Sequence, residues 1–423
     1  MRQGPSAIVH RFHGVAMSIL ILNAMLSRAA SPADHQKSNT DSNCIDPEAA
    51  ASSSSSSALA MARNLNAPIA ADTEGAQFEH ASFWDDHGPL LQSAWEEWEE
   101  QFLQTDFPLS DSTSSRGDEF INPTLSMALK DAFGNPSEET EATVKSLWED
   151  SNDQQPIPTG VYATQLLTPS GISHIRNILD KATSAGIPTR RPNGMNRQGV
   201  IVDPTVHGAV SIKSLVELVE KELIGRVVRP IGRMLFQDRI GCDDDLEYFS
   251  FTIRYDGGDV DADGGNRSNG SDDATGDNES RRDFELKEHR DASIITLNIN
   301  LNLPEEGYAG SNVYFREFPS SEHAETAGTD EKDTSYHESN KDGGTVRFSP
   351  GMAIIHLGAH RHGALPISDS ASGNGGGKRY NLVIWLFGRD GDVRISPYEK
   401  EDQMNVTERW RGCDHTQGIS FDS

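Results

Sequence analysis

The sequence predicts an α+β fold in which helices come first and an antiparallel sandwich or jelly roll follows. Between Pro169 and Phe236 apolar residues recur at the spacing of a helix. After Asp245 the apolar pattern changes to a period of two, over at least six short segments. Helices followed by many short strands are typical of an α+β domain whose strands form two antiparallel sheets.

The individual elements follow in order. Thr168 followed by Pro169 is a typical helix start, because threonine caps the first turn and proline is tolerated there. The helices are expected over residues 168–179, 214–223 and 227–236, and the strands over 248–255, 294–303, 313–315, 346–348, 352–357 and 380–387. Three polar loops, 257–283, 318–343 and 368–377, are expected to emerge at the surface without disturbing the core.

The first 30 residues are typical of a targeting segment. Basic residues precede an apolar run, Val15–Leu26, and small residues follow it. A helix of that length rises only about 18 Å, short of the ~30 Å hydrocarbon core. We therefore expect a cleaved signal peptide or a short signal anchor and a secretory location (ER/Golgi lumen or membrane), with membrane contact only if the segment is not cleaved. A mitochondrial presequence is the alternative, because no acidic residue precedes Asp34. Four glycosylation sequons are compatible with secretion: Asn266, Asn269, Asn278 and Asn405.

Residues 31–155 have the composition of a largely disordered region, with a serine run and many acidic residues. One or two helices are expected in it, at Ser82–Phe107 and Leu125–Phe133. In the first of these helices, the spacing of the aromatic residues favours packing on the following domain; docking to a partner protein is the alternative. No candidate ligand lies in this region, so it is expected to be dispensable for the chemistry. The folded domain is expected over 156–413, with a tail at 414–423.

The overall charge argues against a nucleic-acid partner. The formal net charge is −28, and no lysine- or arginine-rich run offers a local basic patch. The three cysteines lack CxxC spacing and are too few for a disulfide scaffold. The run Asp259–Gly264 copies the first half of an EF-hand loop, but position 12 would be Gly270 instead of a bidentate glutamate, so an acidic solvated loop is the better interpretation.

A short motif, His289-Arg290-Asp291, opens one of the expected strands. Because side chains alternate along a strand, His289 and Asp291 lie on the same face. An imidazole and a carboxylate placed in this way can occupy two neighbouring positions on a metal ion. His362, near the end of a later strand, is the candidate third ligand. Two histidines and one carboxylate that leave positions open are typical of non-haem Fe(II) sites for oxygen activation.

A second feature fits the same chemistry. The strand that follows His362 opens with Lys378 and Arg379. A dicarboxylate cosubstrate needs a buried cation for its distal carboxylate, and a guanidinium serves best because it binds both oxygens.

At this point the motifs become specific. The stretch from about Ile157 to Cys413 resembles the prolyl 4-hydroxylase-like branch of the Fe(II)/2-oxoglutarate-dependent dioxygenases. It is most similar to plant and animal members called 2-oxoglutarate and iron-dependent oxygenase domain-containing proteins. The matching motifs lie at 191–196 with 199–203, 289–291 with 296–298, 350–356, 360–364 and 379–385. The resemblance implies a double-stranded β-helix, the jelly roll, supported by helices on its N-terminal side.

The resemblance also implies roles for individual residues. His289, Asp291 and His362 match the iron ligands, and Arg379 matches the 2-oxoglutarate anchor. Tyr255 stands where relatives use a tyrosine hydroxyl on the cosubstrate carboxylate, although a purely structural aromatic is an alternative. The family's ligand stands four residues before a proline, which favours His362 over His360. Three polar residues precede the core, either as substrate contacts or as turn and cap residues: Arg191, Asn193 and Asn196.

The implied reaction is hydroxylation coupled to the oxidative decarboxylation of 2-oxoglutarate, with Fe(II) as cofactor, O2 as second cosubstrate and ascorbate as reductant. The resemblance suggests a peptidyl proline or lysine as substrate, whereas the same core also serves small molecules. Two alternatives remain open from the sequence. One is a catalytically silent, metal-bound interaction protein, and the other is a zinc-dependent isomerase that has no need of Arg379.

Overall fold

The computed structural model describes residues 57–65, 81–103, 117–149, 157–193, 196, 198–240, 246–256, 285–306, 309–316, 344–368, 377–388 and 404–412 of the 423. All of them belong to one unit, which begins at Ser56. The helices in this part of the chain are α2 (Ala58–Arg63), α4 (Ala81–Phe102), α5 (Gly117–Phe120), α6 (Pro123–Gly134), α7 (Glu138–Glu149), α8 (Pro169–Thr183), α9 (Lys213–Glu217), the π-helix η2 (Leu218–Val228), α10 (Arg229–Leu235) and α11 (Val406–Arg411).

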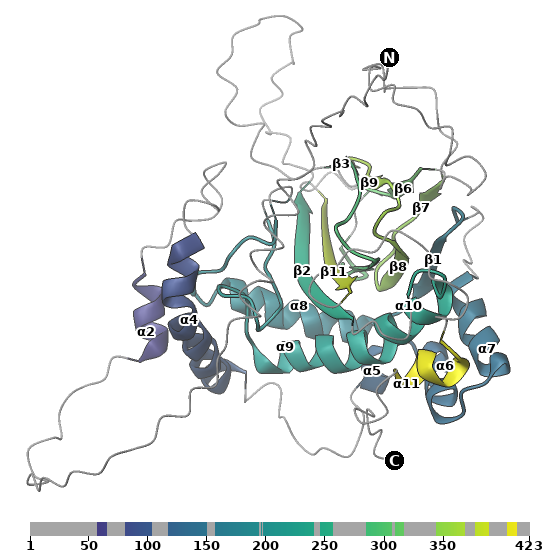
Figure 1. The fold of residues 1–423 in the computed structure, drawn as a ribbon. Helices are drawn as coiled ribbons and strands as arrows, with labels where there is room; N and C mark the ends of the chain where they lie inside the picture. Colours follow the sequence, from purple (N-terminus) through teal and green to yellow (C-terminus); the bar gives the residue numbers. More distant parts are fainter. Residues whose placement is uncertain are drawn as a thin grey trace, which may run out of the picture. The chain divides into compact units, whose positions relative to one another are not determined.

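The larger sheet has the strand order β1-β8-β4-β11-β2, and every neighbouring pair is antiparallel. Its strands are β1 (Val161–Gln165), β8 (Met352–Leu357), β4 (Ile295–Asn300), β11 (Lys378–Phe387) and β2 (Glu247–Asp256) (Figure 1). The long pairing of β11 with β2 aligns Arg379 with Tyr255, and the pairing with β4 aligns Trp385 with Thr296. Residues far apart in the sequence are thereby fixed side by side.

The smaller sheet has the order β3-β9-β6-β7, again antiparallel. Its strands are β3 (Leu286–His289), β9 (His362–Ala364), β6 (Val313–Phe315) and β7 (Thr345–Val346), and β5 (Ala309–Gly310) forms a separate pair with β10 (Ile367–Ser368). Antiparallel sheets combined with helices confirm the predicted α+β class.

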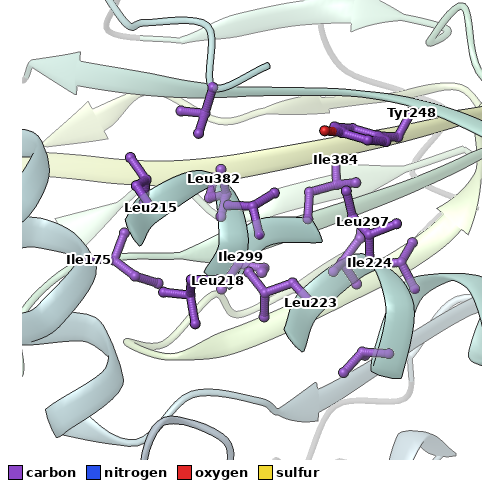
Figure 2. Packing of buried hydrophobic residues seen from close by; sticks show 14 of the residues in the cluster. Ile175, Leu215, Leu218, Leu223, Ile224, Tyr248, Leu297, Ile299, Leu382 and Ile384 are labelled. Carbon is purple, nitrogen blue, oxygen red and sulfur yellow. The ribbon is translucent and has the colours of Figure 1, made fainter. Parts of the chain in front are cut away.

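Each strand of the larger sheet has one face in the hydrophobic core and one face toward the smaller sheet. Figure 2 shows leucines and isoleucines of α9 and η2 packed against those of β4 and β11. On β4 the core side chains are Leu297 and Ile299, so the alternation turns Thr296 and Asn298 the other way. Full burial of each aliphatic side chain contributes roughly 1.5–3 kcal/mol. This core fixes which side chains of the sheet face the cavity described below.

The N-terminal helices differ from the sequence prediction. Residues 31–155 were expected to be mostly disordered with one or two helices, but α2, α4, α5, α6 and α7 all lie between residues 57 and 149. The tryptophans of α4 and α7 are buried in the same cluster as the sheet. The Glu99 carboxylate of α4 accepts hydrogen bonds from the backbone of Lys213 (2.7 Å) and Ser214 (3.0 Å), and so caps α9. The side chains of this region therefore complete the core. The packing favoured by the aromatic spacing of the first helix is confirmed, whereas the expectation of a mostly disordered region with one or two helices, drawn from its charged composition, is wrong for the described residues.

Several predictions fall on residues that the structure does not describe. These are the targeting segment 1–30, all three cysteines, the acidic loops 257–283 (with Asp259–Gly264) and 318–343, and the tail 414–423. Of the four sequons only Asn405 is described, and its side chain caps α11. Within the described ranges, no helix has the length and hydropathy needed to cross a bilayer.

Candidate metal centre and active-site cavity

Three ligand-type side chains converge between the two sheets. His289 ends β3, and His362 begins β9 as its register partner. Asp291 follows two residues later, and its backbone N–H donates to the Gly358 carbonyl at 2.9 Å. One ligand atom from each of His289, Asp291 and His362 lies within 4.8 Å of the others. In the described part of the chain this is the one group of three such residues, so the structure brings together the three residues that the sequence selected.

Backbone hydrogen bonds set both histidines for metal binding. The Nδ1 atom of His289 lies 2.8 Å from the Lys287 carbonyl oxygen, and that of His362 lies 2.9 Å from the His360 carbonyl oxygen. A carbonyl accepts only, so each Nδ1 carries a proton, which leaves each Nε2 as the ring atom that can bind a metal. The two Nε2 atoms lie 3.3 and 3.6 Å from the Asp291 carboxylate. All three lone-pair donors therefore face one point.

The carboxylate of Asp291 is held in its ionised form. It is 7% exposed, and Thr296 Oγ1 donates a 2.6 Å hydrogen bond to its Oδ2. Burial alone would raise the pKa of Asp291, but the charges of His362 and His289 hold that pKa well below its usual range. Ser293 contacts the Thr296 hydroxyl at 2.9 Å and extends this support. Thr296 thus acts as a neighbour that fixes the carboxylate.

The two histidines differ in electrostatic environment. Burial alone would lower the pKa of His289, but its hydrogen bond to Asp291 and the carboxylate charge raise that pKa. Burial dominates at His362 and lowers its pKa. A negative carboxylate next to two imidazoles favours a bound cation, which would take the place of the proton on His289.

The neighbouring histidines are placed differently. The Nε2–H of His360 donates to the Arg316 carbonyl oxygen at 2.7 Å, and His360 is absent from the converging group. His356 packs its ring 4.4 Å from the ring of His362, and burial lowers the pKa of His356 to about 3. A neutral His356 therefore supports His362 by packing. The geometry fits the choice of His362 over His360.

Arg379 lies in the same cavity, away from the metal ligands. Its side chain is 1% exposed and its guanidinium carbon lies 4.3 Å from the ring centre of Tyr255. One guanidinium N–H donates to the Ser311 carbonyl oxygen. Lys378 is exposed, because successive side chains of a strand point to opposite faces. Tyr255 is also buried. Its place beside Arg379 allows both of its sequence-based interpretations, a cosubstrate contact and a packing role.

The cavity contains about 440 Å³ of empty space, part of it open to solvent. Besides the residues above it is lined by Asn193, Asn196, Phe251, Ile253, Leu286, Thr296, Asn298, Val313, Gly363, Ala364, Val383 and Trp385. Asn193 accepts a 2.8 Å hydrogen bond from the backbone of Asn196, so it has the turn role weighed from the sequence. Trp385 and Asn298 had been given no role. Their positions could have been predicted from the sequence, because every second residue counted from Arg379 along β11, and from Thr296 along β4, lies on the same face of its strand.

The donor set suits one kind of metal chemistry. Two neutral imidazoles and one carboxylate on one side of a metal leave three positions open for other ligands, which is the arrangement of non-haem Fe(II) oxygenases. The buried cation at Arg379 suits the far carboxylate of a dicarboxylate ligand that reaches the same metal. The residues therefore fit Fe(II) together with 2-oxoglutarate.

Comparison with known proteins agrees with this assignment, although no protein-family model matches the chain. A Xenopus tropicalis protein named 2-oxoglutarate and iron-dependent oxygenase domain-containing protein 2 is 24% identical over 235 residues, 55% of this chain and 50% of that protein. An Arabidopsis thaliana protein named 2-oxoglutarate and iron-dependent oxygenase domain-containing protein CP2 is 26% identical over 235 residues, which cover 55% and 46%. The chain spans about half the length of these curated relatives. The predicted resemblance is confirmed.

Solved structures give a weaker likeness. A Pseudomonas putida prolyl-4-hydroxylase is 13% identical and matches 56% of this chain and 99% of its own, with a TM-score of 0.28. A prolyl 4-hydroxylase from Phytophthora capsici is 13% identical and matches 68% and 71%, with a TM-score of 0.33. TM-scores of this size do not establish a common fold, so the architecture rests on the strand order and register of the chain itself.

Proposed function

Because this chain is related to the 2-oxoglutarate and iron-dependent oxygenase domain-containing proteins, we propose that it is an Fe(II)- and 2-oxoglutarate-dependent dioxygenase that hydroxylates its substrate. The single observation that carries the proposal is the convergence of His289, Asp291 and His362 within 4.8 Å, with both Nε2 atoms turned toward the Asp291 carboxylate. The same cavity holds Arg379, the cation that a dicarboxylate cosubstrate needs.

The strand order supports a double-stranded β-helix as the finer fold. In chain order, β2, β4, β8 and β11 belong to the larger sheet, which β1 extends at one edge, and β3, β6, β7 and β9 belong to the smaller one. Apart from the edge strand β1, these are eight antiparallel strands divided equally between two sheets, which is the arrangement of a jelly roll. Such a fold places the cavity between the sheets, where the three ligands lie.

Each residue of the site has its own role in the proposed reaction. His289, Asp291 and His362 would hold the metal, Thr296 fixes the carboxylate, and Arg379 would bind the distal carboxylate of 2-oxoglutarate with both guanidinium nitrogens. Iron at this centre supplies the chemistry of O2 activation with oxidative decarboxylation of 2-oxoglutarate to succinate and CO2 and hydroxylation of the substrate. The aliphatic and aromatic walls would limit the access of water to the space between metal and Arg379. Ascorbate would restore iron that has become oxidised.

The substrate proposed from the sequence is a peptidyl proline or lysine, with a small molecule as the alternative. No nucleic-acid partner is proposed, because the net charge of −28 repels phosphate. The secretory pathway remains the proposed location, with a mitochondrial one as the alternative.

One assay tests the proposed function. Purified protein with Fe(II), O2 and 2-oxoglutarate is expected to release succinate slowly without a substrate, and Asp291→Ala is expected to abolish that release. A silent metal-bound interaction protein would bind metal and release no succinate. A zinc-dependent isomerase would need neither O2 nor Arg379. Succinate release that is unchanged in Asp291→Ala would refute the metal site.

A further inference from the structure

The outer edge of β2 is covered by residues 198–202. In the larger sheet β2 is the last strand, and its other side pairs with β11. Along the outer side, the Val202 N–H donates to the Ser250 carbonyl oxygen at 2.8 Å. Further along, the Arg254 N–H donates to the Gln198 carbonyl oxygen at 3.1 Å. Because β2 carries three of the residues that line the cavity, this stretch of chain supports one side of the cavity along its length.

Two residues just before this stretch line the cavity directly. Asn193 and Asn196 both belong to the lining, and Asn196 is 1% exposed. Together with residues 198–202 they form what we call the wall segment. Its first hydrogen bond to β2 lies next to Tyr255, which is the register partner of Arg379. The wall segment therefore reaches the end of the cavity where the distal carboxylate of 2-oxoglutarate would bind.

A short loop holds the wall segment on both sides. Residues 203–208 follow the wall segment and form what we call the docking loop. Directly after this loop, the Val210 N–H donates to the Ile201 carbonyl oxygen at 2.8 Å. Within the loop, the Gly208 carbonyl oxygen accepts a 2.8 Å hydrogen bond from the N–H of Arg190, which precedes the wall segment. A displacement of the docking loop is therefore passed to the wall segment from both of its ends.

Helix α4 packs tightly against the docking loop. Trp84 is 4% exposed, and a methyl group added to Gly208 would lie 2.4 Å from the Cε3 atom of its ring. In the same way, a methyl group added to Gly88 of α4 would lie 2.6 Å from the His207 ring. The Nδ1 atom of His207 also lies 3.2 Å from the Asp85 carboxylate. Close-packed contacts of this kind transmit a displacement to their neighbours, because there is no free space to take it up.

We propose that Trp84 of α4 is a positioning residue of the active site, which acts through the docking loop to keep the wall segment closed over the Arg379 end of the cavity. If the wall segment moves outward, water enters beside Arg379, and the attraction between its charge and a carboxylate weakens in the more polar surroundings. The proposal rests on the proposed function, because it takes 2-oxoglutarate as the ligand of Arg379. It gives α4 a role at the active site, whereas the sequence predicted that this region is dispensable for the chemistry.

Hydrogen exchange of the full chain tests the contact, with Trp95→Ala as the matched control for Trp84→Ala. Both changes remove a buried indole from α4, but the Trp95 ring packs against that of Trp98, with 5.7 Å between ring centres. Trp84→Ala should raise exchange roughly tenfold at the amides that tie the wall segment in place, relative to amides between β4 and β8. Trp95→Ala should leave this ratio unchanged, because a general loss of stability affects both groups alike. The amides to follow are those of Arg190, Val202, Thr252 and Arg254.

Ligand binding by the same variants tests the effect on the site. Each protein is loaded with Mn(II) and titrated with 2-oxoglutarate by calorimetry. Trp84→Ala should raise the dissociation constant for 2-oxoglutarate about fivefold, because the charge of Arg379 becomes wetter. Its Mn(II) affinity should not change, because the histidine ligands stand on β3 and β9 of the other sheet. A purely structural role would not separate the two affinities, and Trp95→Ala should leave both unchanged.

Gly208→Ala disturbs the same contact from the side of the docking loop, and it decides the question if Trp84→Ala does not fold. Gly208 has a φ of +84°, and the added methyl group would collide with the Trp84 ring. Gly186→Ala is the matched control, because Gly186 has a φ of +72° but its added methyl group would find no atom closer than 3.7 Å among the described residues. Gly208→Ala should reproduce the exchange pattern and the weaker 2-oxoglutarate binding, and Gly186→Ala should show neither.

Three results overturn the proposal. One is unchanged exchange at the wall-segment amides in the variants that fold. Another is raised exchange with unchanged 2-oxoglutarate affinity, because α4 would then support the fold alone. The third is an equal effect of Trp95→Ala or Gly186→Ala, which would show general destabilisation. If the unmodified protein binds no 2-oxoglutarate, the proposed function has failed, and the exchange pattern alone then decides whether α4 holds the wall segment.

Discussion

Replacing Arg379 with alanine should weaken 2-oxoglutarate binding far more than metal binding. The side chain is 1% exposed and lies against Tyr255 in the cavity. Removing one partner of a buried charge pair costs about 3–5 kcal/mol, much of it from leaving the other charge buried. Since about 1.4 kcal/mol is a factor of ten, the dissociation constant for 2-oxoglutarate should rise by roughly two to three orders of magnitude.

The assay is calorimetric titration of 2-oxoglutarate into protein loaded with Mn(II), a redox-silent stand-in for iron. Lys378→Ala is the matched control, because Lys378 is the neighbouring cation and points to solvent. Arg379→Lys should fall between the two, since it keeps the charge and loses the two-nitrogen contact. If Arg379→Ala binds 2-oxoglutarate as tightly as the unmodified protein, the anchor is wrong. If Lys378→Ala shows the larger loss, the side chain that faces the cavity has been misassigned.

Three further changes test the site and its support. Asp291→Ala should abolish Mn(II) binding, whereas His360→Ala should retain it, because His360 bonds a backbone carbonyl instead; equal losses would leave the ligand choice unsupported. Thr296→Val removes the hydrogen bond to the carboxylate and should weaken Mn(II) binding about 10- to 100-fold, and an unchanged affinity would remove its supporting role. Trp95→Ala should lower the free energy of unfolding by about 3–5 kcal/mol in denaturant titration, against less than about 0.5 kcal/mol for the exposed Met127→Ala; a small loss at Trp95 would return the N-terminal helices to the dispensable role expected from the sequence.

The sequence by itself was sufficient for the local features of the site. In His289-Arg290-Asp291 the spacing of two residues predicted both ligands on one side, although the motif does not open a strand: β3 ends at His289 and the residues after it carry Asp291. The same alternation separates buried Arg379 from exposed Lys378. The Thr168 cap of α8 is likewise local, because its side chain accepts from the N–H of Gly171. Spacing, alternation and helix caps depend only on residues close in the sequence, so the sequence alone is enough to predict them.

Only the tertiary structure decided which segments meet. The pairing of His289 with His362 closes the triad across the polar loop 318–343, whose sequence holds no information about register. The burial of Trp95 in the core confirms the packing that the aromatic spacing favoured, but the acidic composition of residues 31–155 gave no sign of how many helices would join it. Whether a buried polar side chain such as that of Trp385 or Asn196 finds a hydrogen-bond partner among the described residues was likewise decided only by the tertiary structure. Whether a polar group is satisfied depends on atoms that arrive from distant segments, and a sequence pattern does not contain them.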